Sequence, residues 1–498
     1  VLLVRNRREF RALGSKCPHY GAPLSKGVLR GERLRCPWHG ACFNIRTGDI
    51  EEYPALDCIP CFKVTVEDGK VFITAKKKVL TLPAVTEHRQ CLGLRDTSRR
   101  CLLNKNTMLL LGGGVAALVC AETLRQEGFT GRIIMATKEK HVPYDKSKLS
   151  KEMNLKAEDI YLRKAEFLEA RGIEFWTEKE AVSVDLQKQK VHFMDGSSQK
   201  YHQLLIATGS HSGFLKIPGA DLQNICTLQT PEESSKILEL ATGKNLVVVG
   251  ASFIGTRLER VLCVPAAARD TNGISLQPGA AAELPAWLLA GPFQMLQNKG
   301  VKFHMKTELC ELKGKDGKVT EAVLANGEKL PADVVVLGIG STPNSAFLKG
   351  TSIARDDKGA ILVNLHMQTN IPKVFAAGDV VTFPVALLDG DRSSIHHQQV
   401  AEAHGRCAAL NMLGRGEELH TVPYFWTTLL GKSIRYAGCG KGYTDTVVKG
   451  SLEQQKFLIF YIRDGHVTAA ASLNCDPMVS LIAEVLYLGK QISKEEAE

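Results

Sequence analysis

The sequence predicts a multidomain protein in which a small all-β domain precedes doubly wound α/β domains. Before residue 76 the apolar residues fall in short runs separated by turn residues, which is typical of a β-rich domain. From Thr107 an apolar run, a glycine turn and a helical pattern follow one another, and the same order starts again at Asn245. This β–turn–α–β order is typical of a parallel, Rossmann-like sheet.

Size and composition fit a globular protein with several cores. The chain has 498 residues, enough for about three domains. Its net charge of +10 comes without a dense Lys/Arg block, which favours an anionic cofactor such as a dinucleotide over nucleic acid. The uncharged run at residues 107–121 is shorter than the roughly 20 residues that cross a bilayer, so no transmembrane segment is expected.

Residues 1–75 are expected to form the all-β domain, with a Glu-Asp-Gly hairpin turn near its end. Its strands are predicted at residues 1–4, 62–66 and 71–74. Because the first run starts at Val1, we expect the domain to be truncated at its N-terminus and any targeting segment to be missing. Residues 76–106 hold clustered basic residues and little periodicity, which predicts a linker.

Two short motifs of this domain combine cysteine with histidine: Cys17-Pro18-His19 and Cys36-Pro37-Trp38-His39. A Rieske-type [2Fe–2S] cluster needs two thiolates on one iron and two imidazoles on the other, and the two motifs supply that set. A zinc site and chance are the alternatives, but zinc fingers prefer a C-x2–4-C pair followed by an H-x3–5-H pair. We therefore predict a Rieske cluster held by Cys17, His19, Cys36 and His39.

A glycine-rich turn follows the strand predicted at residues 108–111 and opens the helix predicted at residues 115–127. Its glycines let the backbone approach a pyrophosphate, and the helix N-terminus adds N–H groups and the positive end of a dipole. The next strand is predicted at residues 133–136. The turn therefore predicts a dinucleotide site contacted by Gly112, Gly113, Gly114, Val115, Ala116 and Ala117.

Three later segments accompany this turn: PYDKSKLSK at 143–151, LLIATGS at 204–210 and VFAAGD at 374–379. In this order the four segments resemble those of flavoprotein NAD(P)H oxidoreductases with two dinucleotide-binding domains. A loop of another α/β fold is the alternative for any one segment. The resemblance implies an FAD site with contacts from Lys146, Lys151, Ala181, Thr208, Gly378 and Asp379.

The segments depart from that family in two places. Lys146 stands where an arginine is usual, and Lys138 replaces the acidic residue expected to bond the adenosine ribose, with Glu139 beside it. The predicted flavin domain has no C-x4-C and the predicted nucleotide domain no C-x-x-C, so a glutathione- or thioredoxin-type disulfide reductase is not expected. A 2-His-1-carboxylate domain is not evident either, which argues against a Rieske oxygenase.

The segment NLVVVGASFIG at residues 245–255 resembles an NAD(P)H-binding turn. The pattern does not continue over residues 256–293, where Pro265 would stop the helix after about two turns and a β-branched run for the second strand is missing. We expect a gene-model error here, or else a divergent insertion. The residues that the resemblance implies at this site are Gly250, Gly255 and Glu259.

A cluster domain ahead of such a reductase resembles the Rieske-containing branch of the apoptosis-inducing factor family. PYFWTTLLGKSIRYAG at residues 423–438 and GRCAALNM at residues 405–412 strengthen this resemblance. Trp426 matches a family tryptophan near the flavin, whereas Gln398 departs from the usual tryptophan beside His397. The resemblance implies mitochondrial association and a link to apoptosis.

We predict an enzyme, a flavin-dependent NAD(P)H oxidoreductase that passes electrons from a nicotinamide nucleotide through FAD to the Rieske cluster and then to an unidentified acceptor. The alternative is a cell-death signalling protein whose redox centres are structural or sensory and do not turn over. The predicted domains are a Rieske domain (1–75), a linker (76–106), an FAD-binding domain (107–235 and 366–420), an NAD(P)H-binding domain (236–365, with 256–293 aberrant) and a C-terminal α/β reductase domain (421–498).

Overall fold

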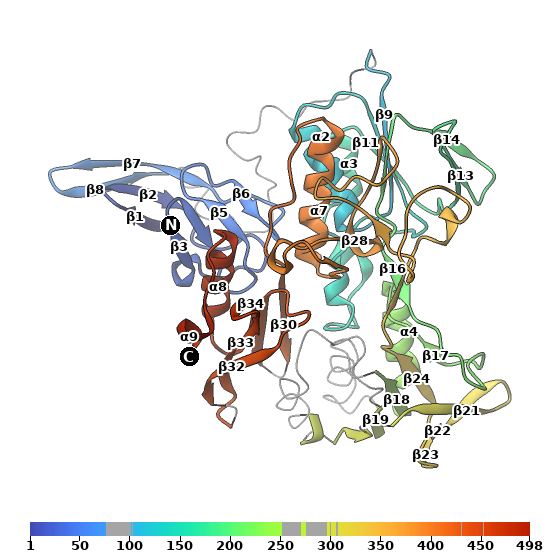
Figure 1. The fold of residues 1–498 in the computed structure, drawn as a ribbon. Helices are drawn as coiled ribbons and strands as arrows, with labels where there is room; N and C mark the ends of the chain where they lie inside the picture. The colour runs from blue at the N-terminus through green and yellow to red at the C-terminus, as the bar shows by residue number, and fades with distance from the viewer. Residues whose placement is uncertain are drawn as a thin grey trace.

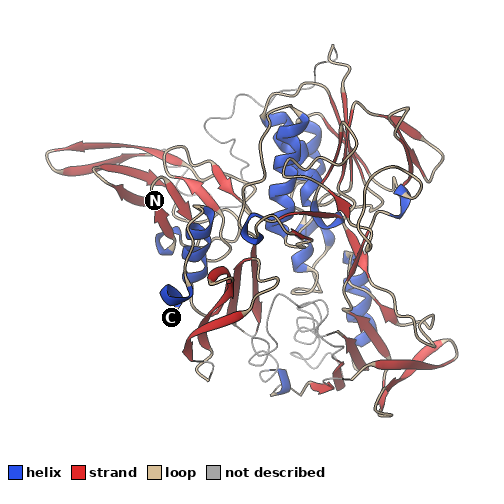
Figure 2. Cartoon of the chain, viewed as in Figure 1, coloured by secondary structure: helices blue, strands red, loops and turns tan. Residues whose placement is uncertain are grey.

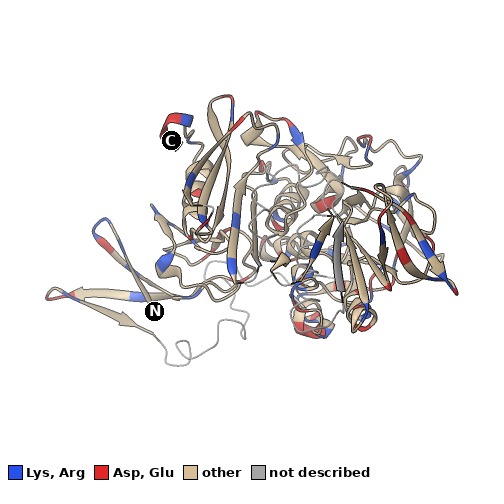
Figure 3. Ribbon diagram, turned by 90° about the horizontal axis from the view of Figure 1, so that it is seen from below, with Lys and Arg blue, Asp and Glu red and all other residues tan. Residues whose placement is uncertain are grey.

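The computed structural model describes residues 1–75, 101, 103–250, 270–274, 296–298, 300–304, 307–429, 431–451 and 453–498. Figure 1 follows the chain from an N-terminal β-domain through two α/β units to a C-terminal sheet. The long helices stand side by side in the middle of the molecule (Figure 2). Basic and acidic residues are interspersed along the ribbon (Figure 3). In the part of the chain that is described, no helix is long and apolar enough to cross a membrane.

Two antiparallel sheets build the N-terminal domain, one ordered β1-β2-β7-β8 and the other β3-β4-β5-β6. Buried Leu13, Leu24 and Phe43 belong to its core. The three strands predicted here are confirmed as β1, β7 and β8. The elements are β1 (Leu2–Asn6), β2 (Glu9–Leu13), η1 (Leu24–Lys26), β3 (Val28–Arg30), β4 (Arg33–Arg35), β5 (Cys42–Asn44), β6 (Ile50–Glu52), β7 (Cys61–Glu67) and β8 (Lys70–Thr74).

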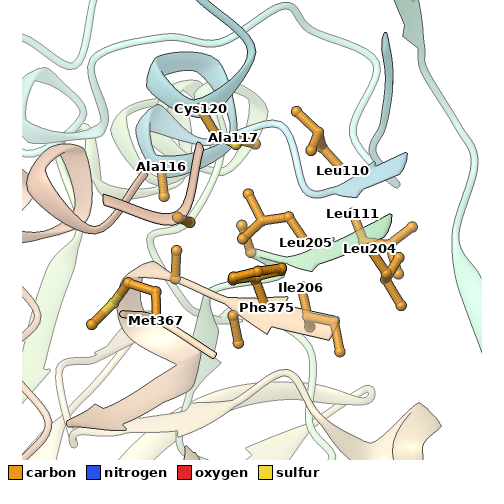
Figure 4. Close-up of a cluster of buried hydrophobic side chains, with 14 of the residues drawn as sticks. Leu110, Leu111, Ala116, Ala117, Cys120, Leu204, Leu205, Ile206, Met367 and Phe375 are labelled. Carbon is orange, nitrogen blue, oxygen red and sulfur yellow. The ribbon is translucent and has the colours of Figure 1, made fainter. Parts of the chain in front are cut away.

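The first α/β unit is built on a parallel sheet of order β11-β10-β9-β15-β27. Helices α2 and α7 pack closely because Gly405 has no side chain, and a Cβ there would lie 2.2 Å from the carbonyl oxygen of Ala116. Figure 4 shows apolar residues of α2, β9, β15 and β27 meeting in the core. The strand, helix and strand predicted at 108–111, 115–127 and 133–136 are confirmed as β9, α2 and β10.

The elements of this unit are β9 (Thr107–Leu111), α2 (Val115–Gln126), β10 (Arg132–Ala136), η2 (Lys146–Lys148), η3 (Ala157–Ile160), α3 (Ala165–Ala170), β11 (Ile173–Trp176), β12 (Ala181–Asp185), β13 (Lys190–Phe193), β14 (Ser198–Lys200), β15 (Gln203–Ile206), β16 (Ser210–Ser212), β25 (Ser341–Pro343), η4 (Ala346–Leu348), β26 (Ile361–Leu362), β27 (Val374–Ala376), η5 (Gly378–Val380), β28 (Val381–Pro384), η6 (Ala386–Leu388), β29 (Arg392–Ser393) and α7 (Gln398–Met412).

The second α/β unit also has a parallel sheet, of order β17-β24-β18-β19-β20. Its strand β19 (Asp270–Ile274) corrects the expectation that residues 256–293 lack the second strand of this fold. The segment is poor in β-branched residues, but β18 and β20 pair with its backbone on both sides, and such pairing overrides a weak propensity. The other elements are β17 (Ile225–Cys226), α4 (Pro231–Ala241), β18 (Asn245–Val249), β20 (Lys302–His304), β21 (Leu309–Lys315), β22 (Lys318–Leu324), β23 (Lys329–Pro331) and β24 (Val334–Leu337).

An antiparallel sheet of order β30-β31-β34-β33-β32 forms the C-terminal domain, and helix α8 packs on it. The strands predicted near residues 457–462 and 467–472 are confirmed as β33 and β34. In Figure 1 this domain lies beside the N-terminal domain, and Arg33 of the first domain contacts Glu484 of the last. Its elements are β30 (Tyr424–Leu429), β31 (Lys432–Gly438), β32 (Asp445–Ser451), β33 (Lys456–Arg463), β34 (His466–Leu473), α8 (Met478–Tyr487) and α9 (Lys494–Ala497).

Candidate redox site

Two tight turns bring the four predicted cluster ligands together. In each turn the cysteine N–H donates to a carbonyl five residues on, that of Ala22 for Cys17 and that of Ala41 for Cys36. The two thiols are buried and hydrogen-bonded to each other. The Nδ1 atoms of His19 and His39 lie 3.0 Å apart. Two sulfur and two nitrogen donors therefore converge on one place.

The surroundings of these donors favour the forms that bind iron. Backbone N–H groups of His19 and Tyr20 point at the sulfur of Cys17, and those of Trp38 and His39 point at the sulfur of Cys36. Such groups stabilise negative charge on sulfur. Burial lowers the pKa of His19 to about 3 and that of His39 well below its usual 6.5, so both imidazoles are neutral at pH 7.

The donor set suits a binuclear cluster. Within the described residues, no three His, Cys, Asp or Glu side chains are grouped as a single metal ion would require. A Rieske cluster needs only two protein ligands on each iron: two thiolates on one iron and two imidazoles on the other. The buried thiol pair and the facing imidazole pair fit this requirement.

Trp426 of β30 brings the C-terminal domain against the histidine ligands. The centre of its ring lies 4.8 Å from that of His39 and 5.4 Å from that of His19. The ring of Tyr20 also packs against both histidines, and its hydroxyl donates to Asp145, in a loop of the first α/β unit. Both histidines are therefore enclosed between the N-terminal domain and the two later domains.

A buried network of charges holds the domains in this arrangement. The guanidinium groups of Arg33 and Arg35 donate to Glu484 of α8 at 2.7 and 2.8 Å, and both also donate to Glu52. Because the charges are paired and hydrogen-bonded, their burial is tolerated, and removing one partner would be costly. This contact between the domains is called the junction below. It joins Tyr20, Arg33, Arg35 and Glu52 on one side to Asp145, Trp426 and Glu484 on the other.

The sequence analysis did not find the charged residues of the junction. Arg35 and Glu484 are 449 positions apart, and neither lies in a motif. A second buried group was missed for the same reason: Arg163 pairs with Glu122 at 2.9 Å and with Asp57 at 3.0 Å. These arginines lie in short strands or loops, where the local sequence gives no sign of a charged partner elsewhere in the chain.

The glycine turn between β9 and α2 has the shape that a pyrophosphate site needs. Gly112 has a φ of +133°, and a Cβ there would lie 2.1 Å from the carbonyl oxygen of Ala207. Around Gly114 there is open space, and α2 begins there without a side-chain cap. The first N–H groups of the helix are therefore directed at a space that an anion can enter. The predicted contacts Val115, Ala116 and Ala117 are in this first turn.

The other predicted flavin residues surround the carboxyl ends of the same parallel strands. Gly378 and Asp379 follow β27, and the hydroxyl of Ser210 donates to Asp379 at 3.5 Å. Thr208 follows β15 and donates to the carbonyl of Asn344. In such sheets ligands bind outside the carboxyl ends of the strands, so this position fits a dinucleotide.

Three further predicted flavin contacts, Ala181, Lys151 and Lys146, lie in other parts of the first α/β unit. Ala181 begins β12. Lys151 lies near His19 and His39, since its charge contributes, after burial, to lowering the pKa of both. Lys146 pairs with Glu139 at 3.1 Å. Glu139, which stands beside the position expected to bond the ribose, also accepts from the hydroxyl of Tyr144 at 2.7 Å.

Only the first part of the nicotinamide-binding turn lies within the described residues. Gly250 follows β18 with a φ of +112°, and a Cβ there would lie 2.4 Å from the carbonyl oxygen of Gly338. A glycine is therefore required where the turn crosses the neighbouring strand. The predicted Gly255 and Glu259, and the helix end predicted at Pro265, lie outside the described residues.

Comparison with known proteins agrees with this division of the chain. The family models matched are the Rieske [2Fe-2S] domain over residues 1–63, the pyridine nucleotide-disulphide oxidoreductase over residues 106–405 and the reductase C-terminal domain over residues 424–498. The ferredoxin reductase for the CYP199A2 system from Rhodopseudomonas palustris has the same fold over 79% of this chain and 97% of its own, with a TM-score of 0.74 and 26% identity.

Fold and site together define a flavin-dependent NAD(P)H oxidoreductase of the ferredoxin reductase type that carries a Rieske [2Fe–2S] domain, with FAD and NAD(P)H as its other cofactors. Apoptosis-inducing factor 3 of Mus musculus is 46% identical over 505 residues, which cover 100% of this chain and 82% of the relative. Rhodocoxin reductase of Rhodococcus erythropolis is 28% identical over 74% of this chain and 86% of its own. The chain belongs to the Rieske-containing branch of the apoptosis-inducing factor family.

Proposed function

We propose that this enzyme passes electrons from a nicotinamide nucleotide through FAD to the Rieske cluster, and from there to a separate acceptor. The observation that carries the proposal is the position of Trp426, whose ring touches both histidine ligands and whose strand belongs to the reductase part of the chain. Bound FAD accepts two electrons as a hydride and releases them one at a time.

The residues of the chain divide this work between them. Gly112, Gly113 and Gly114 would receive the FAD pyrophosphate at the N-terminus of α2, and Asp379 would hold the flavin chain. Cys17, Cys36, His19 and His39 would hold the cluster. The junction would keep the cluster domain against the reductase, so that transfer does not depend on the encounter of two separate proteins.

An anaerobic titration with NADH and then with NADPH tests the proposal. The flavin absorbance should bleach first, and the electron paramagnetic resonance (EPR) signal of the reduced cluster should follow. A parallel titration with dithionite shows that both cofactors are present and reducible. If dithionite reduces them and neither nucleotide does, the proposal fails and a signalling protein with non-cycling redox centres is the better description.

We also propose mitochondrial association and a role in apoptosis, supported only by the family and by the names of the mouse and human relatives. Fractionation of cells that express the full coding sequence with a C-terminal tag tests the first. Caspase activation on overexpression, compared with a Cys36→Ser variant, tests the second and shows whether the cluster contributes. A purely cytosolic product, or no change in caspase activity, would contradict them.

A further inference from the structure

One buried cation of the C-terminal domain lies on the sheet face that meets the cluster. Strands β30 and β31 pair in antiparallel register, with Trp426 directly opposite Arg435. Directly opposed residues of such a pair point to the same face of the sheet. Trp426 contacts His39 on that face, so Arg435 lies on the side that faces the histidine ligands.

Tyr424, which lies on the same face of the sheet as Trp426, holds the loop that contains Cys36. Tyr424 stands two residues before Trp426, and a Cβ at Gly40 would lie 2.7 Å from its ring. Its hydroxyl is 3.0 Å from Ser480, which in turn donates to the carbonyl oxygen of Cys36 at 3.0 Å. The loop from Cys36 to Gly40 is therefore seated directly on this face.

Arg435 is buried with few partners for its charge. Only 4% of its surface is exposed. One terminal nitrogen donates to the carbonyls of Thr427 and Ile434, and the other donates to Asp476 at 3.2 Å. Among the residues that the structure describes, its Nε has no hydrogen-bond partner. Asp476 is the one carboxylate paired with it within these residues.

The field of this charge reaches the ligands. Arg435 lies directly opposite Trp426 in the sheet, and the ring centre of Trp426 lies 4.8 Å from that of His39, so this buried cation stands next to the residue that contacts the histidine. Burial raises the pKa of Tyr424, and Arg435 opposes this more strongly than Asp476 adds to it. At Tyr424, which lies on the cluster side of the sheet, the charge of Arg435 therefore outweighs that of Asp476.

We propose that Arg435 raises the reduction potential of the Rieske cluster, and so favours electron transfer to it from the reductase part of the chain. One-electron reduction adds one negative charge beside Cys36 and His39, and a fixed cation at short range in a buried site stabilises that charge. Arg435 is not itself one of the predicted ligands, and it acts through its charge. The consequence for electron flow rests on the proposed function, but the effect on the potential does not.

A redox titration of the holoprotein with dithionite, followed by the EPR signal of the cluster, tests this proposal without any nucleotide. Arg435→Gln should lower the equilibrium constant for cluster reduction about tenfold, which is about 59 mV for a one-electron couple. Arg435→Lys, which keeps the charge, should restore most of the shift. Lys432→Gln removes the same charge from the half-buried first position of the same strand and should leave the potential unchanged.

The counter-ion supplies a second test in case Arg435→Gln does not fold. Asp476→Asn leaves Arg435 without its carboxylate and should shift the potential upward. Unchanged EPR g values in each variant show that the ligands are intact. The proposal is overturned by an unchanged potential in folded Arg435→Gln, or by a shift to lower potential in Asp476→Asn. Failure of NADH to reduce the cluster would count against the proposed function alone.

Discussion

The junction and the nicotinamide-binding unit are built in opposite ways. At the junction, residues far apart in the chain meet: Arg35 of β4 pairs with Glu484 of α8, and Tyr20 donates to Asp145. In the nicotinamide-binding unit the feature that the structure describes belongs to a sequence motif, since Gly250 directly follows β18. The comparison teaches that a glycine turn can be recognised from the strand that precedes it, whereas a contact between residues that are remote in the chain gives no such local sign.

The largest effect is expected from removing one of the four predicted cluster ligands, which lie in the domain on the N-terminal side of the junction. Cys36→Ser takes away one of the two thiolates and should abolish the cluster completely, measured as loss of the EPR signal and of bound iron. Cys42→Ser is the matched control, because Cys42 of β5 is also a buried free thiol of this domain, but burial raises its pKa to about 12, so that it is not a thiolate at pH 7. A cluster that survives Cys36→Ser would refute the ligand set.

The cluster and flavin motifs could be found in the sequence because their residues are close together in the chain. Cys17 and His19 are two positions apart, and the turn at Gly112 has an apolar strand before it and a helix after it. The junction could not be predicted, because a lone Arg35 in a three-residue strand carries no sign of a partner 449 positions away. Strand β19 was missed because its pairing with two neighbours, and not its residue types, makes it a strand.

The next effect concerns the charges of the junction. Glu484→Ala leaves the buried Arg35 and the half-buried Arg33 without one carboxylate, and breaking such a group costs about 3 kcal/mol or more. The urea midpoint for loss of the cluster's visible circular dichroism should fall accordingly. Glu9→Ala breaks an exposed pair with Arg11 in the same domain and should cost under about 1 kcal/mol. Equal effects of the two variants would show that the junction is not a stabilising contact.

The pH dependence of this contact follows from Glu484. Burial raises its pKa, but the hydrogen bond from Arg33 and the charges of both arginines outweigh this, so that the pKa lies below its usual value of 4.5. Since the folded pKa is the lower one, the contribution is present above about pH 4.5 and is lost as pH falls through the folded value. The difference in stability between the natural chain and Glu484→Ala should therefore shrink below pH 4.5.

A substitution in the nicotinamide-binding unit should impair reduction by NADH while leaving the cluster at the junction intact. Gly250→Ala forces a Cβ to within 2.4 Å of the carbonyl oxygen of Gly338 in a backbone conformation that costs roughly 1–3 kcal/mol for other residues. NADH-driven bleaching of the flavin should weaken about tenfold to a hundredfold. Dithionite should still reduce the cluster at an unchanged potential. Loss of the cluster as well would mean that the two regions depend on each other.

The smallest effect is expected at Trp426, where the reductase touches the cluster. Trp426→Leu keeps an apolar side chain but removes the ring that lies 4.8 Å from His39 and 5.4 Å from His19. We expect reduction of the cluster after flavin bleaching to slow about tenfold, equivalent to about 1.4 kcal/mol in the barrier. Stopped-flow mixing with NADH measures both steps in one experiment. Trp38→Leu is the control, since its ring is 6.3 Å from His39 and belongs to the cluster domain itself. A slower first step with an unchanged second step would assign Trp426 to the flavin site and not to the contact with the cluster.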